Sequence, residues 1–203
     1  MSQKEHWENV FANKQETEVS WYQKSPKTSL DFISKLNLTK DVKIIDIDIG
    51  DSYLVDALLE QGFTNITLLD ISAKAIDRIK NRLGDKAHQV KFIVSDILDF
   101  NPSETYDFWH DRASFHFQTD NHQIVKYANI VANAVAKNGH MIIGTFSENG
   151  PKKCSGLDIT QYNEAKMTTV FETHFDLVDC FVEDHITPFD TIQNFIFCDF
   201  IKQ

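Results

Sequence analysis

Acidic side chains end three strand-like runs of this chain. Asp46, Asp70 and Asp96 each stand at or just after a short run of β-branched and apolar residues. Parallel strands present their carboxyl ends at one edge of a sheet, so we expect these three carboxylates to lie close together there. Asp70 follows Asp46 by roughly 20 residues, the separation at which an acid accepts hydrogen bonds from the ribose of a nucleotide at the first turn. The spacing therefore predicts a site for a nucleotide-like ligand.

The first of these strand ends is unusual for a turn that binds such a cofactor. The segment IIDIDIGDS (44–52) holds a single glycine, Gly50, and Asp48 stands where such turns usually have a residue without a side chain. Forcing a side chain into the left-handed conformation costs roughly 1–2 kcal/mol, although aspartate tolerates it better than most residues. Ser52 is a milder change, because its hydroxyl can donate to a carboxylate or cap the following helix. We expect an altered but correctly placed turn.

Groups that could move a proton follow the fourth strand-like run. His110 and His116 are the candidate general bases, and Asp111 and Arg112 could orient them or hold a charged substrate. The alternative interpretations are a structural charge network at 110–112 and a buried histidine at 116, between two phenylalanines. These side chains show no fixed ligand spacing, so we expect no metal site.

The composition is typical of a soluble globular protein. The 203 residues are 42% hydrophobic and 25% charged, and the formal net charge is -10. This excess of acid argues against nucleic acid or an anionic membrane as the main partner, because both bind basic surfaces. The widely spaced Cys154, Cys180 and Cys198 favour reduced thiols. Together with a polar N-terminus and the lack of an apolar run long enough to span a membrane, the reduced thiols predict a cytoplasmic protein.

The elements that must position these groups alternate between strands and helices. Strands are predicted at 42–47, 66–70, 90–94, 106–110 and 140–146, and helices at 52–61, 73–83 and 120–137. Such alternation predicts a parallel, doubly wound, Rossmann-like α/β sheet.

Further elements lie at both ends of this pattern. Two helices, at 4–14 and 26–36, come before it, and a helix near 163–171 and strands at 175–183 and 195–201 come after it. The link between the last two strands is too short for a helical crossover, so they are expected to pair antiparallel, which gives seven strands with an antiparallel C-terminal strand. We expect a single domain over residues 1–203, with a helical cap (1–40) and a Rossmann-like core (41–203).

Taken in order, five segments resemble the class I S-adenosylmethionine-dependent methyltransferases. They are DIDIGDS (46–52), LLDIS (68–72), VSDIL (94–98), YDFWHDR (106–112) and KNGHMIIGTF (137–146). The opening HWENVF…VSWY (6–22) resembles the N-terminal cap of a methyltransferase-like subgroup that includes some protein-lysine methyltransferases. The resemblance covers nearly the whole chain, and the order and spacing of the segments carry it together.

The resemblance implies S-adenosyl-L-methionine as the cofactor and implies a role for each matching residue. Asp70 would accept from the ribose hydroxyls, Asp96 would accept from the adenine amino group, and His110 would line the methyl-transfer pocket. The residues that the resemblance places around the cofactor are, in chain order, Trp21, Tyr22, Asp46, Asp48, Gly50, Ser52, Asp70, Ile71, Ser95, Asp96, Ile97 and His110. Trp21 and Tyr22 would close over the cofactor, or would simply pack the N-terminal helices on the sheet.

The expected function is methyl transfer to an unidentified acceptor, either a protein side chain or a small molecule. Because Asp48 and Ile49 alter the turn, the alternative is a catalytically weak or inactive cofactor-binding pseudoenzyme. The charge of Asp48 could repel the carboxylate of the cofactor or attract its amino group or sulfonium. A dehydrogenase is disfavoured, because the chain lacks the G-x-G-x-x-G pattern of dinucleotide sites.

Overall fold

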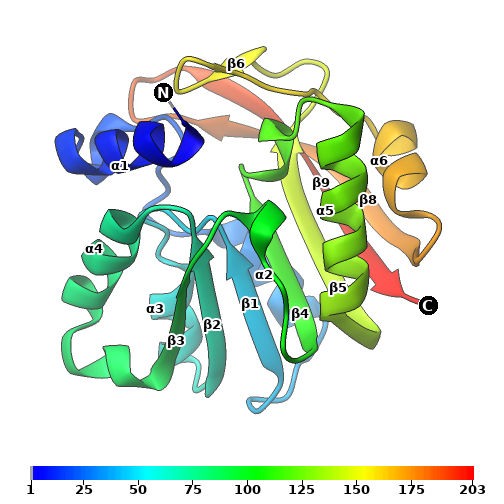
Figure 1. Cartoon of the computed structure of the whole chain (residues 1–203), viewed down its shortest axis with the longest axis horizontal. Coiled ribbons are helices and arrows are strands. Elements are labelled where there is room, and N and C mark those ends of the chain that lie inside the picture. The colour runs from blue at the N-terminus through cyan, green and yellow to red at the C-terminus, as the bar shows by residue number, and fades with distance from the viewer. Residues whose placement is uncertain (1) are drawn as a thin grey trace.

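Seven strands form one mixed sheet (Figure 1). In the computed structural model, which describes residues 2–203, they are β1 (Lys43–Ile47), β2 (Asn65–Asp70), β3 (Val90–Val94), β4 (Tyr106–Arg112), β5 (Val135–Phe146), β8 (Phe175–Ile186) and β9 (Ile192–Lys202). Their order is β3-β2-β1-β4-β5-β9-β8. Strands β1 to β5 run parallel, and β9 runs antiparallel to both β5 and β8. The predicted Rossmann-like sheet with an antiparallel C-terminal strand is confirmed.

Six α-helices accompany the sheet within residues 2–203. They are α1 (Gln3–Asn13), α2 (Lys27–Lys35), α3 (Leu54–Glu60), α4 (Ala73–Leu83), α5 (Asn121–Ala134) and α6 (Glu164–Phe171). Polar caps begin four of them: the side chains of Ser2, Ser72, Asp120 and Asn163 each accept from the backbone N–H three residues later. Four short 3-10 helices complete the set: η1 (Glu16–Glu18), η2 (Gly84–Gln89), η3 (Ile97–Asp99) and η4 (Phe115–Phe117).

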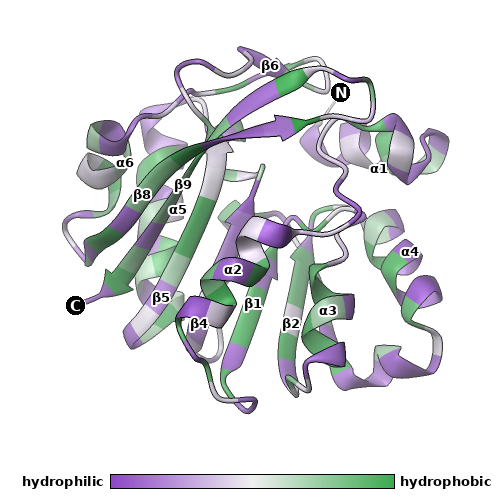
Figure 2. Ribbon diagram, turned by 180° about the vertical axis from the view of Figure 1, so that it is seen from behind, coloured by the Kyte–Doolittle hydropathy of each residue, from purple (hydrophilic) through white to green (hydrophobic). Residues whose placement is uncertain are grey.

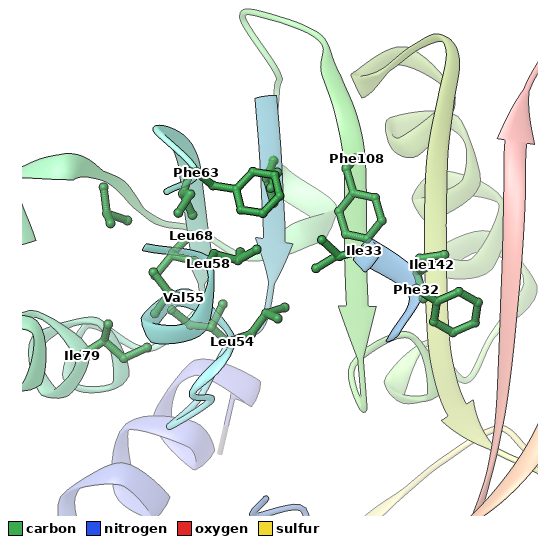
Figure 3. Close-up of a cluster of buried hydrophobic side chains, with 14 of the residues drawn as sticks. Phe32, Ile33, Leu54, Val55, Leu58, Phe63, Leu68, Ile79, Phe108 and Ile142 are labelled. Atoms are coloured by element: carbon green, nitrogen blue, oxygen red, sulfur yellow. The ribbon is translucent and has the colours of Figure 1, made fainter. Parts of the chain in front are cut away.

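The hydrophobic core lies in two layers, one on each face of the sheet. Side chains of α2, α3 and α4 pack on one face, and those of α5 and α6 pack on the other. Figure 2 views the sheet from the side of α2 and α3, and Figure 3 shows the first layer, in which Leu54 and Leu58 of α3 lie beside Leu68 of β2. Successive strand residues alternate between the faces. Ile44 therefore joins the first layer and Ile45 the second.

The structure departs from the predicted elements near the site. Strand β4 continues two residues beyond its predicted end at His110, so Asp111 and Arg112 lie inside the strand and not after it. Strand β5 already begins at Val135, where the helix was expected to continue. A small hairpin of β6 (Lys153–Cys154) and β7 (Leu157–Asp158) occupies a segment that was expected to be a loop.

Two of the three cysteines are joined, which corrects the expectation of reduced thiols. Cys180 of β8 and Cys198 of β9 stand directly opposite each other, with a Cα–Cα distance of 4.2 Å, and form a disulfide. The antiparallel pairing brings together residues that are 18 positions apart in sequence. Cys154 is a free, buried thiol. None of the helices within residues 2–203 is both long and apolar enough to cross a membrane.

Candidate active site

Two adjoining cavities lie at the carboxyl ends of β1, β2 and β4. The first has a volume of about 50 Å³ and is bounded by the β1–α3 turn, by β4, by α2 and by the segment that follows α1. The second also has a volume of about 50 Å³ and is bounded by the ends of β2 and β4, by α1 and by β6. Trp21, Asp48 and Arg112 line both cavities. This edge of the sheet is where open parallel α/β folds bind ligands.

The β1–α3 turn is held in place by backbone hydrogen bonds to β2. The Asp48 N–H donates to the Leu69 carbonyl at 2.7 Å, and the Gly50 N–H donates to Asp70 Oδ2 at 2.9 Å. Asp48 and Gly50 both have positive φ, at 49° and 51°. A Cβ atom on Gly50 would lie 3.2 Å from the Phe11 ring, so the turn requires a glycine there both for its φ and for the close approach of α1.

Asp70 at the end of β2 lies on the second cavity with both carboxylate oxygens engaged. Oδ2 accepts from Gly50, and Oδ1 accepts from the Ser72 N–H at 2.7 Å. Burial raises the pKa of Asp70 to about 7, although these two hydrogen bonds act in the opposite direction and lower it. Each carboxylate oxygen has more than one acceptor position, so Asp70 can still accept from a ligand hydroxyl. Ile71 beside it adds an apolar wall to the same cavity.

A buried chain of three polar side chains lines the first cavity. His110 Nδ1 lies 2.6 Å from Asp46 Oδ1, and His110 Nε2 lies 2.8 Å from the hydroxyl of Ser29 on α2. All three residues are at most 3% exposed. The arrangement places an imidazole between a carboxylate that fixes its orientation and a hydroxyl on the cavity wall. Nothing in the sequence near Ser29 indicated this contact, which depends on how α2 packs on the sheet.

Asp48 stands at the junction of the two cavities. One carboxylate oxygen, Oδ2, accepts from the Ser114 hydroxyl, and the other, Oδ1, is buried without a hydrogen-bond partner among the described residues. Burial raises the pKa of Asp48 well above its ordinary value, and the nearby charge of Asp70 raises it further. The junction therefore contains a carboxyl group with one acceptor atom to spare.

Arg112 borders the same junction from the end of β4. Its Nη1 donates to the Trp21 carbonyl at 3.0 Å, and its guanidinium carbon lies 4.9 Å from the centre of the Phe195 ring. Burial lowers the pKa of Arg112 to about 10, so the side chain is charged at neutral pH. Its Nε atom has no hydrogen-bond partner within residues 2–203. Arg112 both ties down the segment after α1 and brings a positive charge to the wall of both cavities.

The N-terminal segment covers both cavities. Trp21 packs edge-on against Trp7 of α1, with ring centres 5.7 Å apart, and Tyr22 packs edge-on against Tyr53 at 6.5 Å. Polar contacts fasten the cover at several points: Tyr53 donates to Glu16, the Ala73 N–H donates to Glu8, Arg78 donates to the Lys14 carbonyl, and His185 meets the Ser20 carbonyl. Both expected aromatic residues, Trp21 and Tyr22, therefore line the first cavity.

Most residues predicted around a cofactor come together here, but not all. Asp46, Asp48, Ser52, Trp21, Tyr22 and His110 line the first cavity, and Gly50, Asp70 and Ile71 line the second. Ser95, Asp96 and Ile97 line neither cavity. The Asp96 carboxylate instead accepts from the Leu98 N–H at 2.9 Å and begins the short helix η3.

The structure does not bring two of the predicted catalytic or substrate residues to the cavities. His116 is fully buried, with Nδ1 3.1 Å from the Thr145 hydroxyl, and burial lowers its pKa to about 3. Asp111 is also fully buried; it accepts from the Tyr127 hydroxyl at 2.5 Å and from the Ser114 and Phe115 N–H groups. Asp111 therefore organises the turn after β4. Across residues 2–203, no group of three or more His, Cys, Asp and Glu side chains could hold a metal ion.

Sequence reasoning missed six lining residues of the second cavity. They are Trp7, Phe11, Ala113, Ser114, Phe117 and Cys154. Burial raises the pKa of the Cys154 thiol to about 12. No local signal marks these positions, because α1, η4 and β6 meet only in the folded chain.

Solved structures share this fold at low sequence identity. A protein of echinomycin biosynthesis, solved in work on the conversion of a disulfide bond into a thioacetal group, matches 99% of this chain and 93% of its own, with a TM-score of 0.81 and 15% identity. The N-methyltransferase NodS of Bradyrhizobium japonicum WM9, solved in complex with S-adenosyl-L-homocysteine, matches 98% of this chain and 97% of its own, with a TM-score of 0.68 and 16% identity.

Curated relatives match only parts of this chain. Malonyl-[acyl-carrier protein] O-methyltransferase 1 of Ilyobacter polytropus is 32% identical over 83 residues, which are 40% of this chain and 30% of that protein. The eEF1A lysine and N-terminal methyltransferase of Mus musculus is 27% identical over 114 residues, which are 54% of this chain and 16% of that protein. The matched segments therefore span less than a third of either relative.

The family is shown by a match that covers most of the chain. The model of the methyltransferase domain family matches residues 38–187, which include every strand from β1 to β8. The matched segment also contains the turn, the acids and the arginine that surround the two cavities. This chain belongs to the methyltransferase domain family, within the class I S-adenosylmethionine-dependent methyltransferases.

Proposed function

We propose that this protein transfers the methyl group of S-adenosylmethionine to an acceptor that binds next to Arg112. The observation that carries the proposal is the convergence of Asp70, Gly50 and Asp48 on two adjoining cavities at the edge of a methyltransferase-type sheet. Membership of the methyltransferase domain family supports the same donor. The S-adenosyl-L-homocysteine bound to NodS, whose fold is similar, is a further support.

The residues present fit this donor. Gly50 allows a close approach to the turn that no other residue would permit, since a Cβ there would already press on Phe11. Asp70 lies beside the apolar Ile71, which suits a ribose next to an adenine ring. Asp48 adds a buried oxygen that lacks a partner. Asp96 lines neither cavity, so its contact with the adenine amino group rests on the family resemblance alone.

The bound donor would supply an activated methyl group, so the protein has no difficult bond to break on its own. What remains for the chain is to exclude water, to align the acceptor and to remove a proton where the acceptor carries one. The aromatic cover of Trp7, Trp21 and Tyr22 serves the first task. Arg112 serves the second, because it lines both cavities and its guanidinium is charged at neutral pH.

His110 is the base that we propose, acting through Ser29. Both of its ring nitrogens are engaged, so a proton can reach the ring only by way of the Ser29 hydroxyl or after that contact opens. Asp46 would stabilise the imidazolium that forms. We do not assign His116 as a base, because it lies outside both cavities and its low pKa leaves it a weak proton acceptor.

The acceptor is proposed to be a protein side chain or a small molecule. The two curated relatives are named for different acceptors, a malonyl-[acyl-carrier protein] and the protein eEF1A, so they support both classes. A formal net charge of -10 disfavours nucleic acid and anionic membranes as partners. Asp48 favours the alternative of a weak or inactive cofactor-binding pseudoenzyme, because its side chain occupies part of the junction between the cavities.

A turnover screen separates these functions. The purified protein would be incubated with methyl-labelled S-adenosylmethionine and, in parallel, with a peptide pool, a panel of amines, thiols and carboxylic acids, and a cell extract. Label transfer that is lost in Asp70→Asn supports the enzyme. Donor binding without label transfer to any acceptor supports the pseudoenzyme. The absence of both, with the protein folded, would contradict the proposal.

We also propose a cytoplasmic location, which the free thiol of Cys154 favours. The Cys180–Cys198 pair bears on this, because disulfides are rare in that compartment. Trapping of thiols with an alkylating agent at the moment of lysis would find the pair reduced in a cytoplasmic protein. A pair that is oxidised in intact cells would place the protein in an oxidising compartment.

A further inference from the structure

Asp48 has a structural position that none of its neighbours shares. It lines both cavities, its φ of 49° turns the chain between β1 and Gly50, and one of its carboxylate oxygens has no partner within the described chain. The other oxygen accepts from Ser114, which fixes the carboxyl group between the ends of β1 and β4. A buried carboxylate oxygen without a hydrogen-bond partner is costly unless a nearby cation offsets it.

The surroundings of Asp48 are mostly acidic. The titratable and charged groups that face it are Asp70 of β2, Asp96 after β3, Asp111 and Arg112 of β4, and Tyr127 of α5. Arg112 is the one cation in this set, and its Nη1 is directed to the Trp21 carbonyl. No ion pair within 4.0 Å joins Asp48 to any cation of residues 2–203. Burial, and after it repulsion by these acids, raises the pKa of Asp48 well above its ordinary value.

We propose that Asp48 recognises the positive charge on the sulfonium of the donor. The site would then bind S-adenosylmethionine more tightly than its product, in which the sulfur is a neutral thioether. The inference rests on the proposed function and adds a specificity-determining residue to it. An anionic group at this position would be repelled by the three neighbouring acids. A neutral group would leave Asp48 without a charge of opposite sign beside it. A sulfonium satisfies both conditions, because it is a cation that needs no hydrogen-bond acceptor of fixed geometry.

The preference has a pH dependence of definite sign. A cation favours the ionised carboxyl, so donor binding lowers the pKa of Asp48 and releases a proton. Affinity for the sulfonium therefore rises with pH until Asp48 is ionised in the unliganded protein. Affinity for the thioether lacks this contribution. Ionisation of Asp70 changes the affinity for both ligands alike, because they share the same ribose. The ratio of the two affinities therefore reports the contribution of Asp48 alone.

The test compares three ligands on three forms of the protein by calorimetric titration. The ligands are S-adenosylmethionine, S-adenosylhomocysteine and sinefungin, in which an amine replaces the sulfonium and no methyl transfer occurs. The proteins are the wild type, Asp48→Asn and, as a control with the same change of net charge, Asp99→Asn. Asp99 is a surface residue whose side chain is 77% exposed and pairs with Lys126. Asparagine tolerates the left-handed conformation, so Asp48→Asn is expected to fold.

The wild type and Asp99→Asn should bind both cationic ligands more tightly than S-adenosylhomocysteine and should release protons on binding, as seen in buffers of different ionisation enthalpy. In Asp48→Asn, the ratio of the affinity for the cationic ligands to that for S-adenosylhomocysteine should fall about tenfold, which corresponds to about 1.4 kcal/mol. The proton release should also disappear. An unchanged preference in Asp48→Asn overturns the inference and leaves the proposed function standing. Failure of the folded wild type to bind any of the three ligands overturns both.

Discussion

Asp46 and His110 face each other across the pairing of β1 and β4, and a 2.6 Å hydrogen bond joins Oδ1 of one to Nδ1 of the other. The hydroxyl of Ser29, on α2, contacts the second ring nitrogen of His110. These contacts therefore join β1, β4 and α2 at one point. The same three residues line the first cavity. The contact therefore connects the stability of the cap to the shape of the candidate site.

Replacing His110 with leucine should weaken both folding and donor binding. The change leaves the Asp46 carboxylate buried without its partner, and breaking such a pair costs about 3–5 kcal/mol in the free energy of unfolding. Urea unfolding measures the first effect, and calorimetric titration with S-adenosylhomocysteine measures the second. His140→Leu is the matched control, since His140 pairs with Asp199 at 2.8 Å and lines neither cavity. Equal donor affinities in the two variants would contradict a role for His110 in the site.

Replacing Gly50 with alanine should reduce donor binding far more than a similar change elsewhere. The new Cβ would lie 3.2 Å from Phe11 and 3.6 Å from Trp21, so the aromatic cover must move. Gly62→Ala is the control, because Gly62 also has positive φ but nothing lies within 4 Å of its Cβ position. Both variants should lose about 1–2 kcal/mol of stability from backbone strain. Only Gly50→Ala should bind S-adenosylhomocysteine more weakly, and comparable binding by both would refute the steric argument.

The free energy of unfolding should fall as the pH rises from about 4 to about 7. Burial raises the pKa of Asp70 to about 7 and that of Asp111 to about 6, whereas both titrate near 4 in an unfolded chain. The folded protein therefore binds more protons than the unfolded protein in this window, and stability decreases with pH. Urea unfolding at several pH values measures the slope. Asp70→Asn should flatten it, and a stability that rises with pH through this window would contradict the raised pKa values.

Thiol counting should distinguish the three cysteines. Without reductant, the folded protein should show no rapidly reacting thiol, because Cys154 is buried with its pKa raised to about 12 and the other two are joined. Denaturation should expose one thiol, and reduction followed by denaturation should expose all three. Mass spectrometry of an alkylated digest assigns them. Three reactive thiols in the unreduced, denatured protein would show that Cys180 and Cys198 are not paired.

Local signals predicted the parallel core of this fold well. The helix from Ala73 to Leu83 and the strand from Val90 to Val94 lie where sequence reasoning placed them. A hydroxyl cap, a terminal glycine and a β-branched run are properties of the segment itself. Asp46 and Asp70 could likewise be placed at one sheet edge from topology alone.

The rest of the site depends on contacts between distant segments. Ser29 meets His110 only because α2 packs on β1 and β4, and Cys154 reaches the second cavity only because β6 folds over the sheet edge. The pairing of Cys180 with Cys198 follows from the register of β8 and β9. Asp111 has the residue type of a substrate ligand, yet its partners Tyr127, Ser114 and Phe115 make it a support for the turn. Residue type and spacing do not contain this information.

The most direct test of the central claim is calorimetric titration of S-adenosylhomocysteine into folded wild-type protein and Asp70→Asn. We predict single-site binding to the wild type and affinity that is lower by about tenfold in the variant, in which the amide loses one acceptor oxygen and its charge. Circular dichroism confirms that both proteins are folded. No binding to the wild type, or equal binding by both proteins, would contradict the assignment of this sheet edge as a donor site.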